Sequence, residues 1–400
     1  MYAHKSERAV PAPTLAAPTP APAGPGNQAL QDGLPAVSPE PSLLQAAEAQ
    51  LDADLPAAPL DAAAVADALR YYRSQPWKYG PAVLLDLQER VGAPVTEVAD
   101  EATVQGVARH QMRINRDHRP SPPLEVDGKA GPRTLPALAP AGLADGAQID
   151  AYVDAVDAAR PDLDAADADP RLAALAALVN ERLAACRVPP VAVDWARDAD
   201  GHPTRDAANI FDEAHWTILL KADALDDVAR GATTVYHEAR HAEQAFEICR
   251  MRAAEFAPSV SHADRVTSIA VRLQVPLHVA AAAADRPLTF GTTEMTVARN
   301  WHDEEPGRAF GGASAEAEAL SAGIVAFLDG NLTFASLQPL LDAFLEADAR
   351  GYRDQPREWD AFHVSDQVGD RLGVDRAPPT LAALIRQVAA QLGKPVPELP

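Results

Sequence analysis

The chain has 400 residues, and its 35 Lys and Arg against 57 Asp and Glu give a formal net charge of −22. A surface this acidic repels phosphate backbones and anionic lipid headgroups, so binding to nucleic acid or to membrane surfaces is disfavoured. Cys186 and Cys249 allow at most one disulfide, which excludes a disulfide-stapled fold and a zinc site built on C-x-x-C pairs. No segment reaches the roughly 18 apolar residues of a membrane span, and residues 1–8 are too polar for a secretory signal. We therefore expect a soluble protein that is cytoplasmic or is exported by a Sec-independent route.

The first part of the chain is rich in proline and alanine. Nine prolines lie between Pro11 and Pro41, interleaved with Ala, Thr, Ser and Gly. Such a sequence cannot form a helix or a sheet ladder, and it has too few large apolar groups to bury. The composition predicts a disordered, semi-extended arm over residues 1–60.

Residues 61–145 are predicted to form a compact helical domain. Ala62 to Tyr72 and Pro81 to Val91 carry apolar residues at helical spacing, and the compact part extends to about Leu138. The stretch from Pro140 to Asp169 is rich in Ala and Asp with scattered Pro and Gly, which predicts a connection with one short helix.

Two half-units can be laid over each other in this helical segment. In the first, Leu87-Gln88 leads to Asp100-Glu101-Ala102-Thr103, and in the second His110-Gln111 leads to residues 127–135. The second half has a tight turn at Asp127-Gly128, followed by Gly131-Pro132, which predicts that the last helix begins at the proline.

This pattern resembles the bacterial peptidoglycan-binding-like domain, a three-helix module built of two such halves. The resemblance implies that the segment binds glycan or stem peptide and so targets the protein to the cell wall. The first half departs from the family pattern, because Thr96-Glu97-Val98-Ala99 stands where a glycine is expected before Asp100.

Residues 146–375 are predicted to form a second, larger domain, and residues 376–400 a C-terminal tail. Val191–Trp195 and His215–Leu220 are expected to be strands. The expected helices are Arg171–Cys186, Thr233–Phe256 with Gly231 marking its start, a run around Ile269–Ala284, Ala315–Leu328, Leu337–Ala349 and Arg357–Leu372. A small sheet followed by a helix-rich half indicates an α+β, helix-rich fold class.

The sequence His237-Glu238-Ala239-Arg240-His241 has the spacing H-E-x-x-H. Residues four apart on a helix lie one turn apart on the same face, so both imidazoles can bind one Zn²⁺ ion. Glu238 is then placed to take a proton from water acidified by the zinc, which makes it the candidate catalytic residue. Chance rarely produces this motif in a chain with 11 histidines, so it is the sharpest functional signal in the sequence.

The motif and its surroundings resemble the zincin metallopeptidases, which implies a peptide or protein substrate. The strand expected at His215–Leu220 stands where that family places the edge strand that pairs with an extended peptide. Arg240 departs from the family pattern, which prefers uncharged residues between the glutamate and the second histidine. It pairs with Glu243, or reaches a substrate carboxylate, or marks a decayed site.

A catalytic zinc ion needs a third protein ligand. The metzincin continuation is excluded, because Gln244 and Glu247 stand where that subgroup has Gly and His. Glu358, in the first turn of a helix that Pro356 starts, resembles the third ligand of the gluzincins, and we take it as the expected metal ligand.

Other residues compete for the remaining roles around this site. Asp360, Glu316 and Glu318 are the rival third ligands. Asp360 or His363 is expected to orient an imidazole by hydrogen bonding. Tyr352 could donate a hydrogen bond to a developing oxyanion.

The sequence therefore predicts a zinc metallopeptidase with a wall-targeting helical module. One alternative is a hydrolase of peptidoglycan stem peptides, and another is a catalytically decayed zincin that serves as a wall-binding, structural or cargo protein. The start Met1-Tyr2-Ala3-His4-Lys5, followed by the Pro/Ala-rich arm, is similar to cargo and accessory proteins of bacterial extracellular contractile injection systems. That similarity implies a secreted effector and an export or injection apparatus as a partner.

Overall fold

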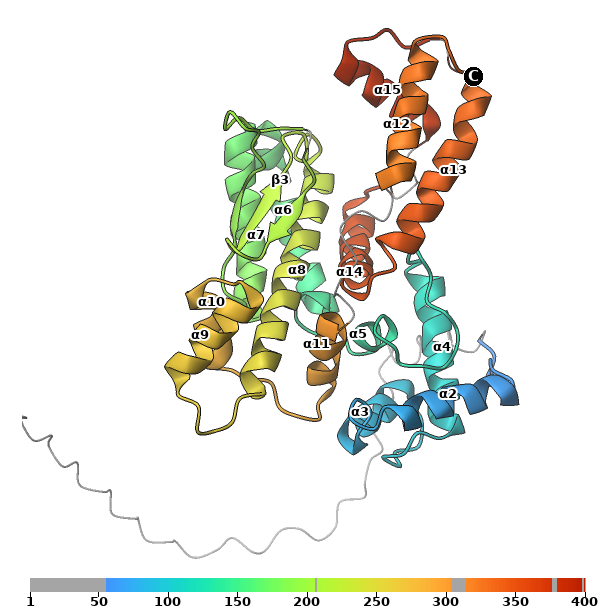
Figure 1. Ribbon diagram of the computed structural model, residues 1–400, viewed down its shortest axis with the longest axis vertical. Helices are drawn as coiled ribbons and strands as arrows, with labels where there is room; N and C mark the ends of the chain where they lie inside the picture. The colour runs from blue at the N-terminus through green and yellow to red at the C-terminus, as the bar shows by residue number, and fades with distance from the viewer. Residues whose placement is uncertain (1–54, 206, 304–313, 376–379, 398, 400) are drawn as a thin grey trace, which may run out of the picture. The chain divides into compact units, whose positions relative to one another are not determined.

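The computed structural model describes residues 55–205, 207–303, 314–375, 380–397 and 399. Almost all of the predicted arm, residues 1–60, lies outside the described residues. The described chain is mostly helical with one small sheet, which confirms the α+β, helix-rich class (Figure 1). Among the described helices, none combines the length and apolar character needed to cross a lipid bilayer.

The N-terminal helices form the two half-units expected from the sequence. They are α2 (Ala62–Ser74), α3 (Pro81–Val91), α4 (Glu101–Asp117) and α5 (Thr134–Leu138). In the first half, Gln88 accepts the backbone N–H of Thr96 and of Glu97 and donates to Thr103 Oγ1. The last helix begins at Thr134, two residues after the predicted start at Pro132.

Gln111 repeats this arrangement in the second half. It accepts the N–H groups of Asp127 and Gly128 and donates to Thr134 Oγ1. Gly128 has φ of +71°, and its counterpart Glu97 has φ of +58°, so a glutamate occupies the left-handed position of the missing glycine. The buried glutamine fixes that turn through both N–H groups, which explains why a non-glycine residue is held there.

These helices share a hydrophobic core with helices that come much later in the chain. Val83, Leu84 and Leu87 belong to the same buried cluster as Met251 and Trp301. The division into one domain at residues 61–145 and another at residues 146–375 stays a prediction, since residues 50–400 form one compact unit.

The stretch expected to be mainly a connection contains a long helix. After the 3₁₀ turn η1 (Gly142–Ala144) comes α6 (Gly146–Ala165), and then α7 (Ala168–Ala185). Ile149, Tyr152 and Val156 of α6 are fully buried at helical spacing. The prediction of one short helix was wrong because abundant Ala and Asp hide this sparse apolar stripe.

The sheet has three strands where the sequence predicts two. β1 (Ala192–Trp195) runs parallel to β3 (Thr217–Leu220), and β2 (Ile210–Asp212) pairs antiparallel with β3. The order is β1-β3-β2, so the strand at 217–220 is central. The prediction that it is the edge strand was wrong, because the three residues of β2 are too few to give a periodic signal.

The helix that carries the H-E-x-x-H motif is α8 (Val228–Ala254). Asp227 caps it by accepting the N–H of Arg230 at 2.8 Å, so the helix begins before Gly231 rather than at it. Gly231 lies inside the first turns, where a Cβ would stand 2.6 Å from Leu225 Cδ2.

Three shorter helices follow α8 and pack along it. The run expected around Ile269–Ala284 is divided into α9 (His262–Leu273) and α10 (Leu277–Ala284), and α11 (Thr293–Asp303) was not predicted. Gln274 ends α9 in the left-handed conformation and Pro276 precedes α10, which explains the break.

The remaining helices are α12 (Ser314–Leu328), α13 (Phe334–Gly351), α14 (Pro356–Leu372) and α15 (Leu381–Leu392). Helices α12, α13 and α15 enclose a small core of their own. Part of the predicted C-terminal tail is therefore the helix α15. Helix α14 instead packs against α8 (Figure 1).

The start of α14 is also attached to the N-terminal helices. Trp359 donates from Nε1 to the carbonyl oxygen of Pro122 at 2.8 Å, and its ring stacks on His363 at 4.9 Å. His118, which caps α4, meets His363 edge-on. Burial, and to a smaller extent the charge of His118, lower the pKa of His363 to about 4.

This buried histidine predicts a pH dependence of stability. Between the ordinary histidine pKa near 6.5 and about 4, the unfolded chain binds a proton at His363 that the folded chain excludes. The free energy of unfolding should therefore fall by about 3 kcal/mol as the pH drops through this window. His363→Phe keeps a ring against Trp359 and removes the titration, so its stability should depend less on pH. Chemical denaturation at several pH values measures both slopes, and equal slopes would show that His363 is not responsible.

Candidate functional site

Helix α8 brings His237 and His241 together on one buried face. Their Nε2 atoms are 3.2 Å apart, and both side chains are at least nine-tenths buried. The motif spacing thus produces the convergence of two imidazoles that the sequence predicts.

Glu358 comes to the same point from the first turn of α14. Its Oε2 lies 3.6 Å from His237 Nε2 and 3.3 Å from His241 Nε2. Ligand atoms about 2.0–2.1 Å from a tetrahedral zinc ion are separated by about 3.3 Å, so these three spacings suit one such ion. Within the described part of the chain, these residues form the group of His, Cys, Asp and Glu side chains that could hold a metal ion.

Two electrostatic features fit a cation at this position. Glu358 Oε2 is buried and has no hydrogen-bond partner. Burial would raise the pKa of Glu358, but the two imidazoles hold it well below its usual range. Burial would likewise lower the pKa of His241, but the Glu358 carboxylate raises it to about 9. The carboxylate is therefore ionised and attracts positive charge between itself and the rings.

The outer nitrogens of both rings are held by polar side chains. His237 Nδ1 is 3.3 Å from Ser365 Oγ, and His241 Nδ1 is 2.9 Å from Gln244 Oε1. Because the amide oxygen of Gln244 accepts, Nδ1 of His241 carries a proton, which leaves Nε2 as the nitrogen that can bind a metal ion. Such hydrogen bonds fix the orientation of metal-binding imidazoles.

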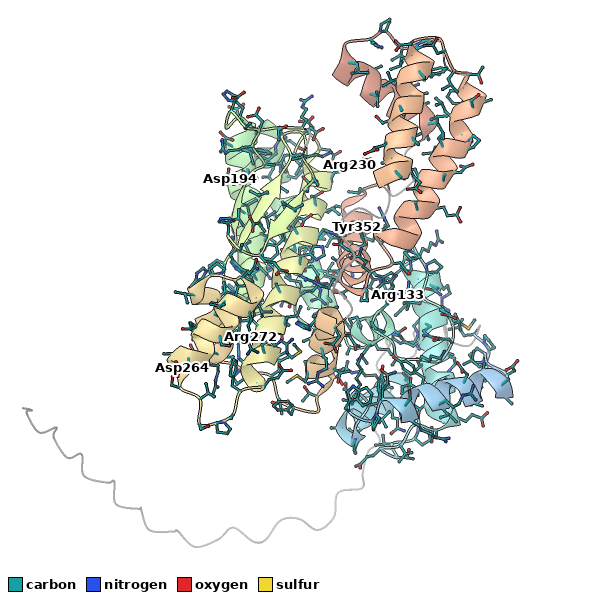
Figure 2. The ribbon with its side chains drawn as sticks, viewed as in Figure 1. Arg133, Asp194, Arg230, Asp264, Arg272 and Tyr352 are labelled. Atoms are coloured by element: carbon teal, nitrogen blue, oxygen red, sulfur yellow. The ribbon has the colours of Figure 1, made fainter. Side chains whose placement is uncertain are left out.

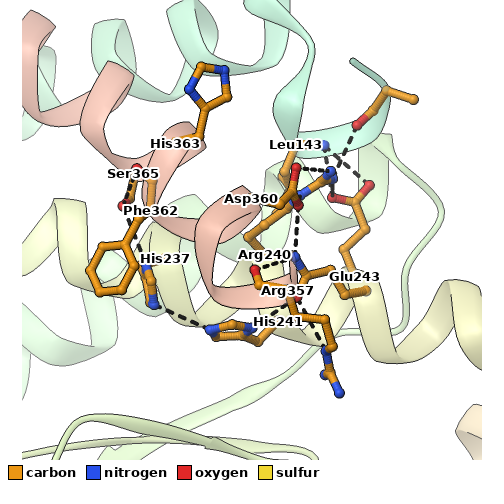
Figure 3. Close-up of polar contacts among 12 residues, drawn as sticks. Leu143, His237, Arg240, His241, Glu243, Arg357, Asp360, Phe362, His363 and Ser365 are labelled. Carbon is orange, nitrogen blue, oxygen red and sulfur yellow. Dashed lines mark hydrogen bonds and ion pairs between the residues drawn. The ribbon is translucent and has the colours of Figure 1, made fainter. Parts of the chain in front are cut away.

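Gln244 is itself fixed by Asp360, and Figure 3 shows that Asp360 in turn meets Arg240. Gln244 Nε2 donates to Asp360 Oδ2 at 2.7 Å, and Arg240 Nε donates to the same oxygen at 2.8 Å. Arg240 is 3% exposed and pairs with Glu243, which is the first of the three roles that the sequence allowed for it. Its side chain is buried between α8 and α14, where it bonds to Asp360.

The guanidinium of Arg240 reaches the residues before α6 as well. It donates to Glu243 Oε2 at 2.5 Å and to the carbonyl oxygen of Ala141 at 3.2 Å. Glu243 in turn accepts the backbone N–H of Leu143 at 3.0 Å. A buried cation between two carboxylates costs little only when all partners are present, so loss of any one is expected to cost about 3–5 kcal/mol. The cluster therefore links the backbone at residues 141–143 to the imidazole of His241.

Glu238 lies beside this group and faces a cleft of about 710 Å³. The backbone N–H of Phe211 in β2 donates to its carboxylate. Burial raises the pKa of Glu238, although His237 and His241 oppose the shift. A raised carboxyl pKa suits a group that accepts a proton and later returns it.

The cleft is bordered by the edge strand β2 and by the start of α14. Ile210, Phe211 and Asp212 of β2 line it, together with Tyr352 and Glu358. Tyr352 thus lines the cleft, as the sequence allowed. The strand beside the site is β2 rather than the predicted 215–220 segment.

The other candidates from the sequence lie elsewhere. The carboxylate of Asp360 accepts hydrogen bonds from Arg240 and Gln244, and it orients His241 through Gln244. Glu316 and Glu318 belong to α12, in the separate C-terminal helical group. His363 stacks on Trp359 and makes no hydrogen bond to His237 or His241 among the described contacts, so its predicted orienting role was wrong.

Several residues of the site could not be identified from the motif. Ser365 and Gln244 are the partners of the imidazoles, and Trp301 packs its ring 5.3 Å from the Arg240 guanidinium while lining the cleft. Gln244 was noted in the sequence for excluding one subgroup, yet its position one turn from His241 was a signal for contact. Ser365 and Trp301 are brought in by tertiary packing.

No protein-family model matches the chain, and neither a curated protein nor a solved structure resembles it significantly. The function must therefore be argued from the site itself.

The close contact between Gly142 and Glu243 provides a test of the Arg240 cluster. Gly142 has φ of +61°, and a Cβ there would stand 1.5 Å from Glu243 Oε1. Gly142→Ala should lower the free energy of unfolding by at least about 2 kcal/mol. It should also weaken Zn²⁺ binding by about 10- to 100-fold, because the displaced cluster no longer orients His241. Calorimetry and metal titration measure the two effects.

Gly146→Ala is the matched control, since a Cβ at Gly146 meets nothing within 4 Å. That variant should leave Zn²⁺ affinity unchanged and raise the free energy of unfolding by about 0.5 kcal/mol. Equal Zn²⁺ affinity in both variants would contradict the proposed link between residues 141–143 and the site.

Proposed function

We propose that the protein is a zinc-dependent metallopeptidase in which His237, His241 and Glu358 hold the metal and Glu238 is the catalytic base. The observation that carries this proposal is the convergence of these three buried ligand atoms beside a second carboxylate, that of Glu238, which can accept a proton and lines an open cleft. Two histidines and one glutamate leave a coordination position open, as catalytic zinc sites require.

A bound Zn²⁺ ion would supply Lewis-acid polarisation of a peptide carbonyl and of water. Glu238 takes the proton of the attacking water and returns it to the leaving amine. Its burial and raised pKa favour the transfer in both directions. The N–H of Phe211 orients this carboxylate, and Tyr352, which lines the cleft, would donate a hydrogen bond to the oxyanion.

The edge strand supports a peptide as the substrate. β2 pairs with β3 on one side only, and residues 208–214 line the cleft. An extended peptide can add to such an edge by main-chain hydrogen bonds. Glu238 accepts a hydrogen bond from the N–H of Phe211 in this strand, so a peptide bound along the strand would lie next to the catalytic carboxylate.

The buried ion pairs of Arg240 support an intact metal-binding site, because its network ends on the imidazole of His241 and orients that ring. The two half-units at Gln88 and Gln111 support a peptidoglycan-binding-like module, and stem peptides are one class of substrate compatible with it. Wall binding, and a partnership with an injection apparatus, remain predictions from the sequence.

The direct test is metal analysis combined with Glu238→Gln. The purified protein should bind one equivalent of Zn²⁺, and chelation should abolish cleavage of a denatured protein substrate. Glu238→Gln should keep the zinc while losing about 10²- to 10⁴-fold in kcat, as expected for removal of a general base.

Glu247→Gln provides the matched control on the same helix. Glu247 pairs with Arg250 at 2.8 Å and lies outside the cleft of Glu238. This variant should keep both zinc and activity. A protein that holds no zinc, or a Glu238→Gln variant that cleaves as well as the native chain, would contradict the proposal.

A further inference from the structure

The cleft at the candidate site continues into a second recess of about 310 Å³. Four residues line both spaces, which makes them one groove: Glu213, Leu273, Gln274 and Arg357. The floor of the recess is α8, at Ala245 and at Cys249, which lie one and two turns beyond His241. At 1.5 Å per residue, these positions are about 6 and 12 Å along the helix from the imidazole.

The walls of the recess are mostly apolar. Ala245, Ile248, Cys249 and Val275 are buried residues that line it, and Leu273 adds a partly buried face. Such walls favour the methylene groups of a side chain over water.

The arginines that line the recess, Arg357 and Arg272, differ in their partners. Arg357 donates to Glu213 Oε1 at 2.7 Å, so these two charges are paired with each other. Arg272, at the end of α9 beside α8, makes no hydrogen bond or ion pair with any residue that the structure describes (Figure 2). The recess therefore carries an excess of positive charge in a chain whose net charge is −22.

We propose that this recess is a carboxylate-binding subsite and that Arg272 selects peptides bearing a carboxylate a few residues from the cleaved bond. This inference rests on the proposed peptidase function. An extended peptide advances about 3.3 Å per residue, so the distance along α8 corresponds to about two to four residues. The carboxylate belongs either to an Asp or Glu side chain or to the end of the peptide.

Zinc-loaded Glu238→Gln protein allows binding to be measured without cleavage. The probes are short fluorescent, alanine-rich peptides with amidated C-termini. Each peptide carries one Glu at a different position, and a matched peptide with Gln at that position is its control. A second pair ends in a free carboxylate or an amide and distinguishes the terminal source from the side-chain source. At the favoured position, the carboxylate should tighten binding about tenfold.

Substitutions at Arg272 identify the residue responsible. Arg272→Glu should abolish the preference for Glu over Gln, and Arg272→Lys should retain most of it, while binding of neutral peptides stays unchanged. Arg230→Glu makes the same change of charge on α8 at an exposed position outside the groove, and it should keep the preference. The subsite is refuted if Glu and Gln peptides bind equally, if Arg230→Glu has the same effect as Arg272→Glu, or if no peptide binds.

Cleavage by the native, zinc-loaded chain separates this proposal from the preceding one. Cleavage without any preference for nearby carboxylates would overturn the subsite and leave the peptidase function standing. Absence of zinc and of cleavage, together with selective peptide binding by the metal-free chain, would overturn the peptidase function and leave a carboxylate-selective groove.

Discussion

The contact between helices α8 and α14 is the constraint on which the candidate site depends. One helix carries two imidazoles and the other a carboxylate, and neither forms a metal-binding group alone. Arg240 holds the pair together, because its guanidinium bonds to Asp360 of α14 while it stands on α8. An arginine suits this place, since its planar donors can serve several acceptors at once and it stays charged when buried.

The same guanidinium extends the influence of the site to distant parts of the chain. Through Glu243 it reaches the backbone at Leu143, and through Asp360 and Gln244 it reaches His241. The departure from the zincin pattern at position 240 thus becomes a structural element of the site. Chains of satisfied buried polar groups are rigid, and they lose much of their stabilisation when one member is removed.

The sequence predicted what depends on local spacing and chemistry. The histidine pair follows from helical geometry, and Glu358 was expected from its resemblance to the third ligand of the gluzincins, on a helix that Pro356 starts. Residue spacing alone did not exclude Asp360, which is only two residues from Glu358 and is directed to Arg240 instead. Long-range packing also decided the roles of Ser365 and Trp301.

The errors in the fold have similar causes. Helix α6 was underestimated because small residues weaken its apolar stripe, and strand β2 is too short to show alternation. Missing β2 led to the wrong edge strand, although the general place of a strand beside the motif was foreseen. Glu97 shows the converse case, in which a buried glutamine allows a residue that turn chemistry disfavours.

X-ray absorption at the zinc edge tests the central claim most directly, because it reports the atoms that surround the metal. The native protein is predicted to hold one zinc ion bound by two imidazole nitrogens and at least one oxygen. Glu358→Gln should weaken zinc binding and change that spectrum, whereas Glu247→Gln should leave both unaltered. A zinc environment without two imidazoles, or a spectrum and affinity unchanged by Glu358→Gln, would contradict this account.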